Sequence, residues 1–281
     1  MVYRRPMLTR PIPSSGAPLP VIGCGTWRGF DIAGQPELRA SRAGVLAALF
    51  DSGGSVVDSS PMYGSSEQVV GELLAASGDR GRAFVATKVW TTGQRAGIAQ
   101  MERSLALLGT DPIDLMQIHN LVDWRTQLLT LRGWKAQRRV RYIGITHYTD
   151  SAHDELEAVL RAEPLDFVQL NYAMTNRAAA RRLLPLAADR GVAVLVNLPL
   201  GGGKALQRLR AQPLPGWAGE IGCTSWNQLM LKFVLSHPAV TCAIPGTSSA
   251  SHMQDNAQAG MGTLPEPAFW TAARLGDCGV D

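Results

Sequence analysis

Short apolar runs recur along the chain at intervals of roughly 25 to 35 residues, about the length of one strand and one helix. Each run is short and mostly apolar, which is typical of a buried parallel strand. Only the last interval is clearly longer. The runs lie at Pro20–Gly25, Ser55–Asp58, Ala83–Val89, Leu115–His119, Tyr142–Thr146, Phe167–Asn171, Val192–Leu198 and Val240–Ile244.

The segments between these runs have the patterns of helices. Apolar residues gather on one face, serines precede the first turn, or a glycine follows the last turn, as expected at helix ends. After Leu200, a long excursion is expected to cross the carboxyl-terminal mouth before the last helix. The clearest predicted helices are Glu37–Phe50, Glu67–Leu74, Arg95–Leu108, Arg177–Asp189 and Ser225–Leu235.

Eight strands with helices between them predict a closed (β/α)₈ barrel of the TIM type, in one domain over residues 1–281. Leu8–Ile12 and Pro18–Ile22 flank a Ser-Ser-Gly turn and predict a β-hairpin that plugs the amino-terminal end. An open doubly wound sheet would need a glycine-rich turn leading into a helix. The glycines between Gly23 and Gly29 have another spacing and no helix pattern follows, so the barrel is favoured.

Composition narrows the function classes. The 281 residues are 46% hydrophobic and 18% charged, with a net charge of +4 spread along the chain, which gives little support to nucleic-acid binding. No run reaches the ~20 apolar residues of a membrane span, and the amino-terminal segment lacks the apolar core of a signal peptide. The four cysteines have no metal-like spacing. We therefore expect reduced thiols, no metal, no membrane and a cytoplasmic monomer.

Four polar residues follow the ends of successive predicted strands: Asp58, Tyr63, Lys88 and His119. The carboxyl-terminal ends of barrel strands meet at one rim, so we expect the four side chains to lie together. A free phenol has a pKa near 10, and a neighbouring ammonium is expected to lower it. Each residue alone could be structural, as a salt bridge or a rim aromatic. Together they predict a proton-donating site.

In the segments that carry these residues, the chain resembles the aldo-keto reductase family, and the resemblance extends over nearly its whole length. The matching motifs are Asp58-x-x-x-x-Tyr63, Thr-Lys88, Gln-Ile-His119 and the first strand at Leu19–Trp27. The resemblance implies hydride transfer from a nicotinamide to an aldehyde or ketone. Tyr63 would be the acid, Lys88 and Asp58 would tune it, and His119 would orient the carbonyl.

Two other functions stay open. The same family includes channel-associated subunits that bind the cofactor and act mainly as partners. A barrel isomerase or lyase without cofactor is the third possibility, although the cofactor motifs count against it.

The resemblance also implies a nicotinamide cofactor, with Thr146, His147 and Gln169 at the positions that contact its carboxamide. The segment Ile244–Asn256 resembles the family's adenosine-phosphate site, in which Asp255 and Asn256 match the residues that bind the adenine. Gly246 and His252 stand where many NADPH-preferring members carry Lys and Arg, but Thr247, Ser248 and Ser249 can still hold a 2′-phosphate. We therefore expect NADPH, with NADH possible. Leu198 departs from the family patterns after the seventh strand. The residues expected to contact the cofactor are Gly25, Thr26, Trp27, Asp58, Thr146, His147, Gln169, Asn197, Leu198, Pro199, Leu200, Gly201, Pro245, Gly246, Thr247, Ser248, His252, Asp255 and Asn256.

Aromatic residues after the first, third and fourth strands predict the substrate pocket. A pocket with such walls should prefer apolar or aromatic carbonyl compounds. Trp124 could equally pack on the rim without touching substrate. The expected substrate-binding residues are Trp27, Met62, Trp90, His119, Leu121 and Trp124.

Overall fold

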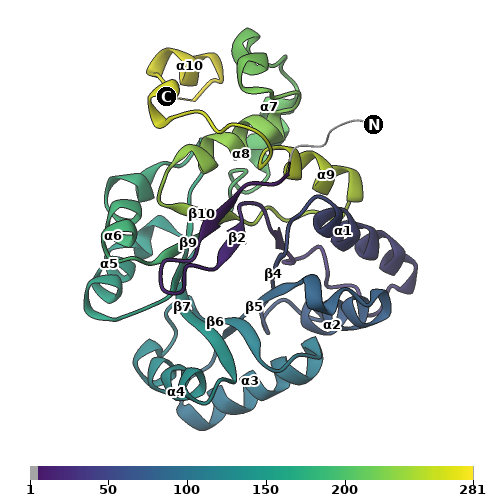
Figure 1. Cartoon of the computed structure of the whole chain (residues 1–281), viewed down its shortest axis with the longest axis vertical. Coiled ribbons are helices and arrows are strands. Elements are labelled where there is room, and N and C mark those ends of the chain that lie inside the picture. The colour runs from purple at the N-terminus through teal and green to yellow at the C-terminus, as the bar shows by residue number, and fades with distance from the viewer. Residues whose placement is uncertain (1–5, 281) are drawn as a thin grey trace.

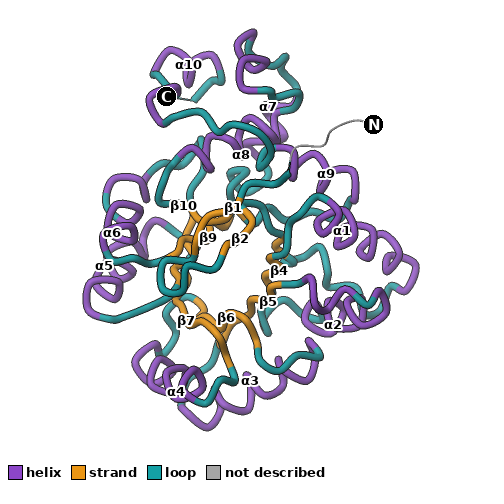
Figure 2. The backbone as a smooth tube through the Cα atoms, viewed as in Figure 1, coloured by secondary structure: helices purple, strands orange, loops and turns teal. Residues whose placement is uncertain are grey.

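The computed structural model describes residues 6–280 and contains one curled sheet of eight parallel strands in chain order, seen end-on in Figure 2. Each strand pairs with the strands that precede and follow it in the sequence, as the predicted barrel requires. The strands are β3 (Cys24–Gly25), β4 (Val56–Asp58), β5 (Phe84–Val89), β6 (Ile113–His119), β7 (Val140–Thr146), β8 (Phe167–Asn171), β9 (Ala193–Asn197) and β10 (Val240–Ala243).

Contacts between the first and last strands complete the barrel. Parallel bridges join Ile22 to Ala243 and Gly25 to Gly246, and the Gly23 N–H donates to the Ala243 carbonyl at 2.9 Å. A Cβ at Gly23 would lie 2.7 Å from the Cβ of Val56, so glycine is what permits this close approach. The (β/α)₈ prediction is confirmed.

Helices surround the sheet on the outside (Figure 1). α8 is buried along its whole length, because the barrel covers one side and segments before and after it in the chain cover the others. The helices are α1 (Arg39–Asp51), α2 (Ser66–Ser77), α3 (Gln94–Leu108), α4 (Trp124–Ala136), α5 (His153–Ala162), α6 (Leu183–Asp189), α7 (Lys204–Arg210), α8 (Trp226–Ser236), α9 (Ala250–Gln258) and α10 (Ala272–Asp277).

The excursion after β9 differs from the prediction. Its first residues, Gly201 and Gly202, line a pocket at the rim, and α7 then packs on α8 beside α10, at the periphery of the molecule (Figure 1). Trp217 then contacts Trp270 edge-to-face, with ring centroids 6.0 Å apart. The excursion therefore covers the outer face of α8 and does not close the mouth.

The helix predicted at Arg177–Asp189 is also interrupted. A 3₁₀ helix at Ala178–Arg181 is followed by α6, and the backbone breaks at Arg182 with φ −137° and ψ −50°. Pro185 has no N–H to donate and restricts the residue before it. In the first turn of α6 that N–H has no intrahelical partner anyway, so the α-helix begins anew just before the proline.

The hairpin of β1 (Thr9–Pro11) and β2 (Pro18–Pro20) lies across one end of the barrel (Figure 1). Ser15 Oγ is 2.8 Å from the Tyr142 hydroxyl, and the Arg10 guanidinium donates to the Leu235 carbonyl at 2.6 Å. The hairpin side chains Ile12 and Leu19 pack with the barrel-interior residues Val56, Ala86, Leu115, Tyr142, Phe167, Ala193, Leu195, Cys242 and Ile244.

Candidate active site

The four residues predicted to act together do converge at the carboxyl-terminal rim. Lys88 is fully buried, and its Nζ donates to Asp58 Oδ2 and to the Ser59 carbonyl, both at 2.7 Å. Lys88 Nζ also lies 5.0 Å from the centre of the Tyr63 ring. The Tyr63 and His119 rings meet edge-to-face at 5.9 Å. A phenol, an ammonium, a carboxylate and an imidazole therefore share one site.

The Asp58 carboxylate has two further partners. Its Oδ1 accepts hydrogen bonds from Gln117 Nε2 at 3.2 Å and from Gln169 Nε2 at 2.9 Å. Gln117 belongs to the Gln-Ile-His119 motif, but the sequence analysis gave it no role of its own. The signal was there, since Gln117 lies two residues before His119 on the same strand face and pairs in register with Lys88. Three donors offset the cost of burying this carboxylate.

Protonation of Tyr63 differs from the expectation. Burial raises the pKa of Tyr63, and Asp58 acts in the same direction. Lys88 acts to lower that pKa, as expected, but does not outweigh the burial. Burial also opposes the charge on Lys88, yet Asp58 and Tyr63 prevail and the pKa of Lys88 is raised. In the resting protein Tyr63 is therefore a protonated donor beside a permanent cation.

His119 is neutral in this site. Burial, followed by the charge of Lys88, lowers its pKa to about 2. Its Nδ1 lies 2.9 Å from Ser60 Oγ, whereas its Nε2 has no hydrogen-bond partner in the part of the chain that the structure describes. Ser60 is a second residue that the sequence reasoning missed.

Predicted nicotinamide-binding residues lie next to the tetrad of Asp58, Tyr63, Lys88 and His119. Register pairs His119 with Thr146 and Thr146 with Gln169 across β6, β7 and β8. Thr146 Oγ1 donates to Gln169 Oε1 at 3.2 Å, and Gln169 donates in turn to Asp58. One chain of hydrogen bonds thus joins the proton-donating side of the rim, around Asp58, to the predicted nicotinamide side, around Thr146.

The His147 side chain turns back on its own backbone. Its Nδ1 accepts from the N–H groups of Tyr148 at 3.1 Å and Thr149 at 3.3 Å, and its ring stacks on Tyr148. Burial lowers the pKa of His147. The ring is therefore neutral and held in place, with Nε2 as its remaining donor.

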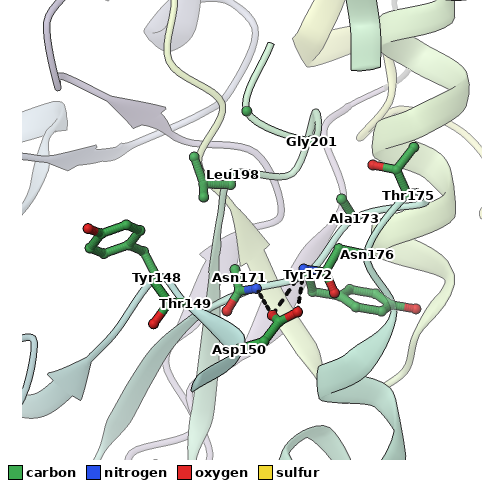
Figure 3. A pocket seen from close by; sticks show the side chains of 11 residues that line it. Tyr148, Thr149, Asp150, Asn171, Tyr172, Ala173, Thr175, Asn176, Leu198 and Gly201 are labelled. Carbon is green, nitrogen blue, oxygen red and sulfur yellow. Dashed lines mark hydrogen bonds between the residues drawn. The ribbon is translucent and has the colours of Figure 1, made fainter. Parts of the chain in front are cut away.

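A pocket of about 380 Å³ adjoins this part of the rim (Figure 3). Tyr148, Leu198 and Gly201 border it, and the Asp150 carboxylate lies in it, accepting from Asn176 Nδ2 at 3.0 Å. Leu198 has a positive φ of 49°, which is uncommon for a branched residue.

Asn197 has an unpaired acceptor. Its Nδ2 donates to the His147 carbonyl at 3.3 Å, but its Oδ1 is buried without a partner among the described residues. Buried polar atoms are normally paired, so this oxygen fits a donor on a bound molecule.

A cation that the sequence did not suggest lies against the predicted phosphate-binding segment, Ile244–Asn256. The Arg42 Nη1 donates to the Ser248 carbonyl at 3.2 Å, and its Nε donates to the Gly29 carbonyl. Arg42 is only 9% exposed, and no carboxylate within residues 6–280 pairs with it. α1 brings this guanidinium to a segment more than 200 positions away, where Gly246 and His252 supply no fixed charge.

Two residues predicted to hold adenine are engaged by α8. Asp255 accepts from Ser225 Oγ at 2.8 Å, and the buried Asn256 accepts from Asn227 Nδ2 at 2.9 Å. Their contacts with adenine remain predictions.

Aromatic side chains stand exposed around the mouth. Trp27, Met62 and Trp90 are 51%, 38% and 42% exposed, and Tyr148, which was not foreseen as a rim residue, is 52% exposed. Leu121 is buried near the rim. Trp124 opens α4 and packs partly on the core, so its role in a substrate pocket remains a prediction.

Comparison with known proteins decides the family. The model of the aldo/keto reductase family matches residues 21–271. The chain belongs to this family. The tetrad of Asp58, Tyr63, Lys88 and His119 is thereby seen in an aldo-keto reductase barrel, and the resemblance read from its motifs is confirmed.

Similar proteins within the family have named activities. The methylglyoxal reductase YeaE of Escherichia coli is 29% identical over 253 residues, which cover 87% of this chain and 86% of the relative. The 9,11-endoperoxide prostaglandin H2 reductase of Trypanosoma cruzi is 28% identical, with 85% and 81% covered. An aldo-keto reductase of Klebsiella pneumoniae solved with NADPH has a TM-score of 0.79 and 26% identity, with 99% and 95% covered.

Two other features bear on function class. None of the helices within residues 6–280 is long and apolar enough to cross a membrane. The same residues contain no group of three or more His, Cys, Asp or Glu side chains placed to hold a metal ion.

Proposed function

We propose that this aldo-keto reductase reduces aldehydes or ketones to alcohols with NADPH, and that Tyr63 is the general acid. The observation that supports this proposal most directly is the buried ion pair of Lys88 and Asp58 beside the Tyr63 ring. A partner subunit that only binds cofactor would have no need of such a costly arrangement, since two buried charges must be desolvated.

The roles of the chain's own residues follow from their protonation. The bound nicotinamide supplies the hydride. Tyr63 donates its proton to the carbonyl oxygen as charge develops there, and Lys88 stabilises the phenolate that remains. Asp58 holds the Lys88 ammonium at 2.7 Å. Neutral His119 directs the carbonyl oxygen toward the phenol.

NADPH is the proposed cofactor because the rim offers partners for its different parts. The unpaired Asn197 Oδ1 and the His147 Nε2 suit the nicotinamide side. At the other end, Arg42 is a buried cation without a carboxylate partner among the described residues. A 2′-phosphate near Ser248 would supply the missing negative charge. Arg42 would then do the work of the Lys and Arg that are absent at positions 246 and 252.

Apolar or aromatic carbonyl compounds are the proposed substrates. The exposed Trp27, Met62 and Trp90 surround the mouth and would contact such a molecule. The four cysteines are free and buried, which suits a reducing compartment and the proposed cytoplasmic location. A monomeric state is proposed as well.

Tyr63→Phe is the decisive experiment. With NADPH and an aromatic aldehyde such as 4-nitrobenzaldehyde, loss of the phenol should lower kcat by about a hundredfold to ten-thousandfold. The dissociation constant for NADPH, followed by quenching of protein fluorescence, should stay within a factor of about two, because the phenol acts on the substrate. Wild-type protein that binds NADPH but turns over no carbonyl compound would support the partner-subunit function instead. An equal loss of NADPH binding in Tyr63→Phe would show that the role of Tyr63 is misassigned.

A further inference from the structure

Ser60 and His119 form a buried pair beside the general acid. Ser60 is completely buried and His119 is 5% exposed, and Ser60 Oγ lies 2.9 Å from His119 Nδ1. Ser60 follows β4 in the segment that also carries Tyr63, whereas His119 ends β6. The pair therefore joins the loop of the acid to the imidazole across the barrel rim.

The direction of this hydrogen bond follows from the other partners of Ser60. Its Oγ accepts from the Met62 N–H at 3.4 Å, and the hydroxyl has no acceptor other than His119 among the residues the structure describes. If His119 carried its proton on Nδ1, the Ser60 hydroxyl hydrogen would be buried without an acceptor. Such an unsatisfied donor costs about 1–3 kcal/mol, so Ser60 donates and Nδ1 accepts.

We propose that Ser60 is a positioning residue that holds His119 in the tautomer protonated on Nε2. A neutral imidazole has only one N–H, so a proton that is kept off Nδ1 must sit on Nε2. Nε2 is also the ring nitrogen without a partner in residues 6–280. Ser60 thereby decides whether His119 offers the site a hydrogen or a lone pair.

This choice matters for a carbonyl substrate, and to that extent the proposal rests on the proposed function. An Nε2–H donates to the carbonyl oxygen together with the Tyr63 hydroxyl. The other tautomer would present a lone pair to the same oxygen and repel it. Ser60 would never touch the substrate, yet it would determine how strongly His119 attracts it.

The tautomer can be measured on the resting protein at pH 7, without cofactor or substrate. In ¹⁵N-labelled protein, long-range ¹H–¹⁵N correlations distinguish a protonated ring nitrogen from an unprotonated one. The chain has 5 histidines, and the signals lost in His119→Gln identify those of His119. We expect wild-type His119 to be neutral and protonated on Nε2. Protonation on Nδ1, or on both nitrogens, overturns the proposal.

Ser60→Ala removes the donor and should leave a mixture of both tautomers. Ser60→Cys keeps a weak donor and should give an intermediate population. Thr130→Val is the matched control, because Thr130 is also buried and its hydroxyl donates to the Thr126 carbonyl within α4. An unchanged His119 tautomer in folded Ser60→Ala overturns the positioning role.

Kinetics provide a second readout. Ser60→Ala should lower kcat/KM for an aromatic aldehyde about twofold to tenfold, with Ser60→Cys in between and NADPH affinity unchanged. Thr130→Val should keep the wild-type value. A wild-type protein without reductase activity but with His119 protonated on Nε2 would overturn the proposed function and leave the role of Ser60 supported.

Discussion

The two halves of the rim differ in how their polar groups are satisfied. On the proton-donating side, Asp58, Lys88 and His119 are buried and bonded to other residues of the chain. On the nicotinamide side, Asn197 Oδ1 has no partner within the described chain, and a pocket of about 380 Å³ opens beside Leu198. On the first side the charged groups are held by the chain itself, with only His119 Nε2 and Gln117 Oε1 left without partners among the described residues, whereas the other side has an unpaired acceptor next to an open pocket.

This difference reflects what each half has to do. A general acid must have its environment set before the substrate arrives, because electrostatic stabilisation is strongest when the charges are already in place. A binding surface must instead keep hydrogen-bonding groups free. Gln169 belongs to both halves, since it accepts from Thr146 and donates to Asp58.

The largest expected effect follows from breaking the buried ion pair. Lys88→Met leaves the Asp58 carboxylate buried without its cation and should lower the free energy of unfolding by about 3–5 kcal/mol. Asp58→Asn combined with Lys88→Met should recover part of this loss but none of the activity. Urea unfolding of the three proteins gives the comparison.

A pair with an exposed cation is the matched control. Arg161 and Glu157 lie at the same distance of 2.7 Å, but Arg161 is 63% exposed, and Glu157 keeps Arg182 as a second partner at 3.2 Å. Arg161→Met should therefore cost at most about 1 kcal/mol. Equal losses for the two pairs would contradict the view that burial makes the proton-donating side distinctive.

A smaller effect concerns stability at acidic pH. The pKa of His119 falls from 6.5 to about 2 on folding, so between these values the unfolded chain binds a proton that the folded chain does not. Stability must then fall as the pH drops below 6.5, by at most about 1.4 kcal/mol per pH unit for one proton. His119→Gln should make this decline shallower in urea unfolding at pH 7, 6 and 5.

His147 provides the comparison from the nicotinamide side. Its pKa is also lowered by burial, but its side chain is only partly buried. His147→Gln should therefore flatten the decline less than His119→Gln does. The same slope for wild type and His119→Gln would show that His119 is not held neutral.

The smallest expected effects concern the phosphate end of the rim. Arg42→Met should weaken 2′,5′-ADP binding about tenfold by calorimetry, with little change for 5′-AMP, because only the former carries the 2′-phosphate. Gly246→Lys adds a cation at an exposed position and should raise the preference for NADPH over NADH by a similar factor.

Gly246→Ala controls for the added Cβ, which would lie 3.3 Å from the Gly25 carbonyl. Equal weakening of both nucleotides in Arg42→Met would indicate that Arg42 only holds the loops together. An unchanged ratio in Gly246→Lys would place the 2′-phosphate elsewhere.

Local patterns predicted the strands and the tetrad well, and they failed where the outcome depended on distant segments. The end of α3 at Gly109 follows from the left-handed conformation that glycine adopts there. The break at Arg182 was missed because the regular apolar pattern of this segment was given more weight than Pro185 within it. The path of α7 was missed because no local pattern shows that the outer face of α8 is buried by the excursion before it.

The sequence by itself determined the barrel, its hairpin and the positions of Asp58, Tyr63, Lys88 and His119, because strand periodicity places polar residues at one rim. Only the tertiary structure decided which other residues contact and support the site. Ser60, Gln117 and Arg42 act through contacts between segments far apart in the chain. Protonation was likewise decided by the fold, since burial outweighs the effect of Lys88 on the pKa of Tyr63. Desolvation depends on everything packed around a group, which no local pattern contains.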